Sequence, residues 1–150
     1  MLAYPDTSFL CALYRTQANS PQAAAYFQAM LGPLEVTSLL LYEFRQAVRF
    51  QIRLRRHDPT KGYPRPEGKK MLADFKSDLI SGAVVVIPGP WHQVHSAAER
   101  LSELYTDANG HRSMDILHVA SAIELGATMF LTFDANQKKL AEAEGLVVPV

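Results

Sequence analysis

Four acidic residues carry the chemistry that this sequence can perform, because each lies near the start of a predicted helix. Asp6 and Asp134 directly follow short apolar runs that predict strands, and Asp115 lies in the first turn of another helix. Glu43 lies one turn into a helix, between leucine and aromatic residues. An ionised carboxylate in such surroundings is costly unless a cation pairs with it, and hard oxygen ligands favour Mg²⁺ or Mn²⁺. We therefore predict that these four side chains bind Mg²⁺ or Mn²⁺.

Each of the four acids also has a structural interpretation. Asp6 and Asp134 can cap their helices by accepting hydrogen bonds from free backbone N–H groups. Asp115 can complement the dipole of its helix, and Glu43 can pair with an arginine of its own helix. Capping and metal binding are compatible, because they can use different oxygen atoms of one carboxylate. At this point both interpretations stay open.

The elements that must position these acids are predicted from short apolar runs that alternate with longer segments of helical period. Strands are expected at 1–5, 35–37, 83–87, 128–133 and 146–150. Helices are expected at 7–15, 20–31, from 38 through 52, about 69–81, about 91–105, 113–125 and 134–144, with Ser20 and Ser38 as caps. Strands separated by helices predict a parallel sheet covered on both faces. Functional groups gather at the carboxyl ends of such strands, which singles out the acids that follow them.

The segment from Arg53 to Gly68 departs from this pattern. It holds five glycine or proline residues and five basic residues, which predicts an exposed loop that can continue the preceding helix briefly. We therefore expect a single domain over residues 1–150 with a basic loop insertion at about 53–70.

Charge is distributed unevenly along the chain, although the formal net charge is zero. Arg45 to Lys76 carries a balance of +7 and the remainder a balance of −7. A basic belt of this kind can attract a polyanion while acids elsewhere bind a cation; the alternative is a solvated helix and loop. The basic residues predicted to contact nucleic acid are Arg49, Arg53, Arg55, Arg56, Lys61, Arg65, Lys69, Lys70 and, outside the belt, Arg112. Tyr63 is an exposed loop residue in this interpretation and can stack on an unpaired base or on nothing.

The composition is that of a globular chain, since 48% of its 150 residues are apolar. The single cysteine, Cys11, cannot form an intrachain disulfide, which fits a reducing compartment. We expect no transmembrane helix and no membrane partner, because no apolar run reaches about 18 residues. The N-terminus lacks the basic segment of a signal peptide, so the expected location is the cytoplasm. Without a cysteine pair or a His-x-x-x-His helix, a zinc site is poorly supported.

At four places the sequence resembles the PIN-domain family, and specifically the VapC-like toxins of toxin–antitoxin pairs. These segments span most of the chain in family order, and they are Tyr4 to Leu10, Leu41 to Ala47, Ser113 to Ala122 and Leu131 to Ala141. An Asp-Thr-Ser after a strand is a weak signal. The Asp-x-x-His-x-Ala-x-Ala helix followed by Leu-Thr-x-Asp is a fairly specific one.

The resemblance implies a PIN-like three-layer α/β/α sandwich with a central parallel sheet of four to five short strands. It implies a Mg²⁺- or Mn²⁺-dependent ribonuclease and maps the family's acidic quartet onto Asp6, Glu43, Asp115 and Asp134. Further polar residues are implied around the site, namely Ser8, Thr132 and Asn136. A VapB-like antitoxin partner and a homodimer are also implied. The chain departs from the family pattern in its long basic segment and at Pro5, which has no N–H and can end the strand early or leave a ladder bond unmade.

Phosphodiester hydrolysis is the function that these observations favour. Asp6, Asp115 and Asp134 would ligate the metal directly or through water, and Glu43 would ligate it or help deprotonate the attacking water. One alternative is a catalytically silent PIN-fold module that binds RNA or protein. Another is a phosphatase with Asp6 as covalent nucleophile, although Ser8 occupies the place of that motif's second acid. His118, one turn after Asp115, can reach the same cleft or be a core residue.

Overall fold

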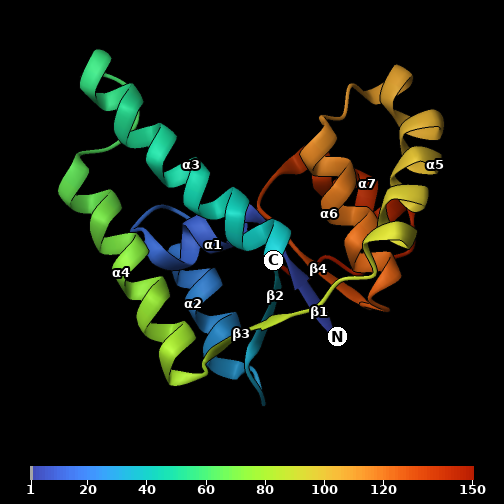
Figure 1. The fold of residues 1–150 in the computed structure, drawn as a ribbon, viewed down its shortest axis with the longest axis horizontal. Helices are drawn as coiled ribbons and strands as arrows, with labels where there is room; N and C mark the ends of the chain where they lie inside the picture. The colour runs from blue at the N-terminus through green and yellow to red at the C-terminus, as the bar shows by residue number, and fades with distance from the viewer. Residues whose placement is uncertain (1) are drawn as a thin grey trace. The chain divides into compact units, whose positions relative to one another are not determined.

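Figure 1 shows the computed structural model, which describes residues 2–150. These residues form seven helices and four short strands. In chain order they are β1 (Ala3–Pro5), α1 (Thr7–Tyr14), α2 (Ser20–Ala29), β2 (Leu34–Thr37), α3 (Ser38–His57), α4 (Arg65–Ser81), β3 (Val84–Ile87), α5 (Trp91–Asn109), α6 (Ser113–Glu124), β4 (Met129–Leu131) and α7 (Ala135–Ala143). The order of strands and helices agrees with the prediction from the sequence. Within residues 2–150, no helix is both long and apolar enough to cross a bilayer.

The described chain divides into two compact units. The first consists of residues 2–9 and Ile87–Val150, and the second of Leu10–Val86. The strands pair as β1 with β4, which lie in the first unit, and β2 with β3, which lie in the second unit except for Ile87, the last residue of β3. A single domain over residues 1–150 stays a prediction from the sequence.

The first unit is built on the parallel pair of β1 and β4, in which Tyr4 lies opposite Phe130. Tyr4 and Phe130 are fully buried with stacked rings, and α5, α6 and α7 contribute the rest of this core through residues such as Leu101, Val119 and Leu140. The strand expected at 146–150 is reduced to a single parallel bridge between Met129 and Val147. Because β1 and β4 are parallel and in register, the residues that follow them emerge at the same edge.

Pro5 is the last residue of β1, which agrees with the prediction that this proline can end the strand early. The backbone N–H of Asp6 donates to the carbonyl of Leu131 over 3.0 Å. Alternate residues of a strand bond to the same neighbour, so the nitrogen of Pro5 is directed away from β4. The missing donor therefore costs the β1–β4 ladder nothing.

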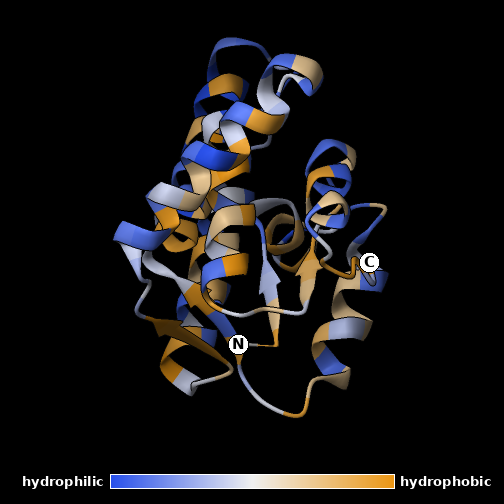
Figure 2. Ribbon diagram, turned by 90° about the vertical axis from the view of Figure 1, so that its right-hand side faces the viewer, coloured by the Kyte–Doolittle hydropathy of each residue, from blue (hydrophilic) through white to orange (hydrophobic). Residues whose placement is uncertain are grey.

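The second unit has an aromatic core between α1, α3 and α4. The rings of Phe44 and Phe75 meet edge to face with centroids 4.9 Å apart, and Tyr14 packs on both. The Tyr14 hydroxyl donates to Asp78 over 2.8 Å. Alternating hydrophilic and hydrophobic bands along the helices are visible in Figure 2, and in α3 the buried face is formed by Leu40, Phe44 and Val48, spaced four residues apart.

The expected basic loop at about 53–70 is wrong for most of its length. The helix α3 continues to His57 and α4 begins at Arg65, so only residues 58–64 connect the two helices. Arginine and leucine at 53–56 are good helix formers, and Pro66 fits the first turn of α4. The glycine and proline count of the segment therefore marks a helix-to-helix connection and a helix start rather than one long loop.

Several helix ends also differ from the prediction. Thr37 rather than Ser38 caps α3, because its Oγ1 accepts from the backbone N–H of Leu40 over 3.3 Å. Ser20 is already helical, and its hydroxyl accepts from the N–H of Gln17 and donates to a backbone carbonyl. The helix α5 extends to Asn109, where Gly110 takes a left-handed conformation with a φ of 70°.

The strand β3 was expected to be buried, but Val86 in this strand is 48% exposed.

Candidate functional site

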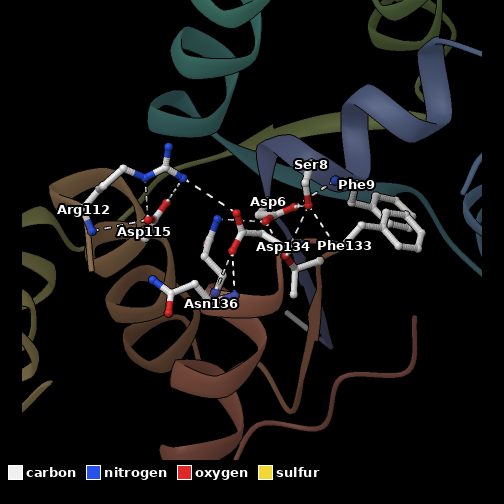
Figure 3. Close-up of polar contacts among 10 residues, drawn as sticks. Asp6, Ser8, Phe9, Arg112, Asp115, Phe133, Asp134 and Asn136 are labelled. Carbon is white, nitrogen blue, oxygen red and sulfur yellow. Dashed lines mark hydrogen bonds and ion pairs between the residues drawn. The ribbon is translucent and has the colours of Figure 1, made fainter. Parts of the chain in front are cut away.

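Asp6 is a fully buried carboxylate that accepts hydrogen bonds on both oxygens. It caps α1, because Oδ1 accepts from the backbone N–H of Phe9 over 2.8 Å. The same oxygen accepts from the hydroxyl of Ser8 over 2.7 Å, as Figure 3 shows. Oδ2 accepts from the Thr132 hydroxyl over 2.5 Å and from Nε2 of Gln137 over 3.0 Å. Four donors match the lone-pair capacity of one carboxylate. The predicted capping role of Asp6 is therefore confirmed on Oδ1, and a metal ion at Asp6 would have to replace one of these donors.

Burial raises the pKa of Asp6 from its ordinary value of 3.8 to about 6. The hydrogen bonds from Thr132, Ser8 and Phe9 oppose this rise in the pKa of Asp6, and the nearby His118 opposes it electrostatically. His118 itself is fully buried, and its Nδ1 is hydrogen bonded to the hydroxyl of Tyr4 at 2.9 Å. Desolvation of the Asp6 carboxylate therefore outweighs these three hydrogen bonds, and a nearby cation would favour its charged form.

Hydroxyl groups tie the end of β1 to the end of β4. The Ser8 hydroxyl accepts from the backbone N–H of Phe133 over 2.8 Å and lies 3.2 Å from that of Thr132. The Thr132 hydroxyl in turn accepts from the N–H of Asp134 over 3.0 Å. Ser8 and Thr132 therefore lie beside Asp6 and fix the backbone that presents Asp134.

Asp134 caps α7, and one of its oxygens serves this role. Oδ1 accepts from the backbone N–H groups of Asn136 and Gln137 over 2.8 and 3.0 Å. Asn136, expected near the site, thus contacts Asp134 through its backbone, whereas the side chain of Gln137 reaches Asp6. Reasoning from the sequence missed Gln137, although a glutamine three residues after a helix cap is a known signature.

Asp115 and Asp134 share one cation, the guanidinium group of Arg112. Asp115 is bound in a bidentate manner, with Nε donating to Oδ2 over 2.9 Å and Nη2 to Oδ1 over 3.2 Å. Nη2 also lies 3.7 Å from Oδ2 of Asp134, the oxygen that does not cap α7. Figure 3 shows Arg112 reaching from the start of α6 to both acids. Arg112 was predicted to contact nucleic acid, and here it pairs with two of the predicted metal ligands.

The carboxylates of Asp6, Asp115 and Asp134 are suitable ligands for a divalent cation, but in this structure they are not grouped around one point. Within residues 2–150, no three His, Cys, Asp or Glu side chains are grouped closely enough to hold one ion. Asp6 is occupied by four protein donors and Asp115 by Arg112. The guanidinium group of Arg112 nevertheless forms ion pairs with two of the predicted ligands, Asp115 and Asp134, so these two carboxylates already share one cation. Carboxylate oxygens are ligands suited to Mg²⁺ or Mn²⁺, so the donor set fits once these side chains exchange partners.

Glu43 belongs to the second unit and is half-buried on α3, next to the buried Phe44. Its grouping with the three aspartates stays a prediction from the sequence.

The basic belt is exposed, which contact with a polyanion would require. Its eight members are Arg49, Arg53, Arg55 and Arg56 on α3, Lys61 in the connection, and Arg65, Lys69 and Lys70 on α4. Lys61 and Lys70 have acidic partners, Asp58 at 3.4 Å and Asp74 at 2.5 Å. Tyr63 is not an exposed loop residue, because it is 6% exposed and the Arg15 guanidinium lies 4.8 Å from its ring centroid. It is therefore unavailable for stacking on a base.

Comparison with known proteins gives one family match and a set of similar structures. A model of the PIN domain matches residues 3–143. No curated protein sequence matches this chain. The structure of VapC20 from Mycobacterium tuberculosis, described as a sarcin–ricin loop cleaving toxin, is similar with a TM-score of 0.66 and 20% identity, covering 97% of this chain and 96% of that one.

Two further similar structures contain VapBC proteins. VapBC2 from Rickettsia felis, bound to a DNA fragment from its promoter, has a TM-score of 0.65 and 15% identity, covering 99% of this chain and 97% of that one. VapBC-1 from nontypeable Haemophilus influenzae has a TM-score of 0.64 and 14% identity, covering 99% and 96%. Together with the family match, these similarities confirm the predicted PIN-like α/β fold.

Proposed function

This chain belongs to the PIN domain family, and we propose that it is a divalent-metal-dependent endoribonuclease that hydrolyses RNA phosphodiester bonds. The observation that carries the proposal is the common edge of β1 and β4. There Thr132 donates to the buried Asp6 and accepts from the backbone of Asp134. Two parallel strands thus deliver two acids to one place, which is where sheets of this kind locate their chemistry.

Asp6, Asp115 and Asp134 are the proposed metal ligands, with Glu43 as the fourth from the sequence. A bound Mg²⁺ or Mn²⁺ would lower the pKa of a coordinated water and offset negative charge on the phosphate. The protein's own contribution is orientation. Ser8 and Thr132 hold the carboxylate of Asp6 on both oxygens, and α7 holds one oxygen of Asp134, leaving the other directed outward to Arg112.

RNA is the proposed substrate because the exposed basic belt offers cations to a phosphate backbone. Such contacts give affinity without reading sequence, and they weaken as salt rises. The three arginines at the end of α3, Arg53, Arg55 and Arg56, are exposed. We assign them the main role, since Lys61 and Lys70 are already paired with acids.

We also propose that the chain acts as the toxin of a toxin–antitoxin pair in the cytoplasm. Similar structures come from VapBC proteins, and we therefore expect a VapB-like antitoxin and a homodimer here. Co-purification of the chain with the product of a small neighbouring reading frame, when the two are expressed together, supports the partner; separate elution of both contradicts it.

A catalytically silent PIN-fold module that binds RNA or protein is the second candidate. It is favoured by one observation, that no three potential ligands within residues 2–150 are grouped to hold an ion. A phosphatase with Asp6 as nucleophile is disfavoured, because Asp6 is fully buried and accepts from four donors.

The deciding experiment is cleavage of a labelled single-stranded RNA by the whole chain, free of any antitoxin. Reactions contain Mg²⁺, Mn²⁺, or EDTA, and RNA binding is measured in the same buffers by fluorescence anisotropy. Cleavage with either metal and none with EDTA supports the ribonuclease. RNA binding that is equal with and without metal, with no cleavage in any buffer, supports the silent module instead.

A further inference from the structure

Arg112 occupies a position that a metal ion bound by Asp115 and Asp134 would also need. Its guanidinium takes both oxygens of Asp115 and faces the one oxygen of Asp134 that does not cap α7. A monovalent cation of the protein and a divalent cation from solution therefore use the same carboxylate lone pairs. Both cannot be bound in this way at once.

The two sides of this contact differ in their freedom to move. The side chain of Asp115 is 5% exposed, whereas that of Arg112 is 75% exposed. Leaving the acids exposes Arg112 to water at little cost, because the guanidinium remains charged and hydrated. The contact of the Arg112 backbone with Asp115, with N–H to Oδ2 at 3.4 Å, does not depend on the guanidinium group.

We propose that Arg112 is an internal competitor for the metal, which holds Asp115 and Asp134 together when the ion is absent and must release them when it binds. This inference rests on the proposed metal site and adds to it a residue that sets metal affinity. Because competition lowers affinity, the wild-type chain binds metal more weakly than its carboxylates alone would allow.

The test is Mn²⁺ binding measured by isothermal titration calorimetry on wild-type, Arg112→Gln and Arg112→Lys proteins, without RNA. Arg112→Gln removes the competing charge, and we expect it to bind Mn²⁺ about threefold to fivefold more tightly, the ratio given by a well-oriented but mostly exposed ion pair. Arg112→Lys keeps a charge but loses the bidentate fork, so its affinity is expected between the other two.

Arg100→Gln is the matched control. Arg100 forms another two-pronged ion pair in the same unit, with its Nη1 and Nη2 at 3.3 and 2.6 Å from the oxygens of Glu144. Its removal costs a similar ion pair but is expected to leave Mn²⁺ affinity unchanged. Thermal melting provides a second measurement: without metal, Arg112→Gln melts about 2–4 °C below wild type, and saturating Mn²⁺ narrows that gap.

Two results would overturn the inference. One leaves the proposed ribonuclease standing, and the other contradicts it as well. If Arg112→Gln binds Mn²⁺ with the wild-type affinity or more weakly, while wild type cleaves RNA in Mn²⁺, only the competition is wrong. If neither protein binds Mn²⁺, the metal site itself is wrong and the proposed ribonuclease falls with it.

Discussion

Thr132 donates a 2.5 Å hydrogen bond to Oδ2 of Asp6, although 126 positions separate the two residues in the chain. The contact exists because β1 and β4 are parallel and end together, so that the residue after β4 meets the residue after β1. It places a hydroxyl donor on a carboxylate that burial would otherwise leave with a still higher pKa. The buried carboxylate of Asp6 therefore makes the stability of the metal-free protein depend on pH.

The first prediction concerns this charge in metal-free protein. The pKa of Asp6 is raised from 3.8 to about 6 by burial, so between these pH values the folded state holds a proton that the unfolded state has released. The stability that Asp6 contributes is therefore complete below pH 3.8 and is lost as pH rises from there through 6, by about 3 kcal/mol in total. Asp6→Asn, which is neutral throughout, lacks this loss. Urea unfolding in EDTA from pH 3.5 to 7.5 measures this loss, and curves of unfolding free energy against pH that run parallel for the two proteins would contradict it.

The acids that follow strands could be found from the sequence because two regularities coincide. Asp6 and Asp134 each come directly after an apolar run, and parallel strands bring such residues to one edge. The structure places both there, joined through Thr132. What the sequence could not supply was the partners of Oδ2 of Asp6, since the donors Thr132 and Gln137 lie more than 120 positions away in the chain.

The wrong predictions for the segment between α3 and α4 also have physical explanations. Glycine and proline at 59–68 suggested a long loop, but helical residues on both sides extend α3 and α4 into it. Tyr63 lies in that connection and is nevertheless buried, because Arg15 packs against its ring. Burial of one loop side chain depends on a contact 48 positions away, which periodicity cannot report.

Gln137, which sequence reasoning overlooked, is predicted to matter more than its neighbour Asn136. Gln137→Leu removes the Nε2 donor of Asp6, and loss of a group that orients a metal ligand typically lowers activity about tenfold to a hundredfold. Asn136→Ala keeps the backbone N–H that Asp134 accepts, so its RNA cleavage rate should stay within about threefold of wild type. Initial rates in Mn²⁺ compare the two. A larger loss in Asn136→Ala than in Gln137→Leu would reverse the assignment.

The basic belt is predicted to control the salt dependence of RNA binding. Arg55→Ala combined with Arg56→Ala removes two exposed cations from the end of α3, which should reduce the slope of log affinity against log salt by about 1.4 for single-stranded RNA. Anisotropy titrations between low and moderate salt measure this slope. Arg100→Ala with Lys139→Ala changes the net charge equally outside the belt, and a slope reduced as much by this control would show that the belt lies elsewhere.

Glu43 provides a prediction that separates metal binding from structural pairing. If Glu43 is a metal ligand or proton acceptor, the substitution Glu43→Gln weakens Mn²⁺ binding or slows RNA cleavage by about tenfold or more. The melting temperature then stays close to that of wild type. Glu35→Gln, at another half-buried acid of the second unit, serves as the control. A lowered melting temperature with unchanged Mn²⁺ affinity and cleavage rate would assign Glu43 to structural pairing alone.

The ribonuclease proposal is tested most directly by the rate of single-stranded RNA cleavage in Mn²⁺ by Asp115→Asn, compared with Asp107→Asn. Asp115 is buried beside Arg112, whereas Asp107 is an exposed acid on α5. We expect Asp115→Asn to lose activity by at least about a hundredfold while remaining folded, since a proposed ligand is removed, and Asp107→Asn to cleave at the wild-type rate. Equal rates for wild type, Asp115→Asn and Asp107→Asn would contradict the assignment of the acidic site.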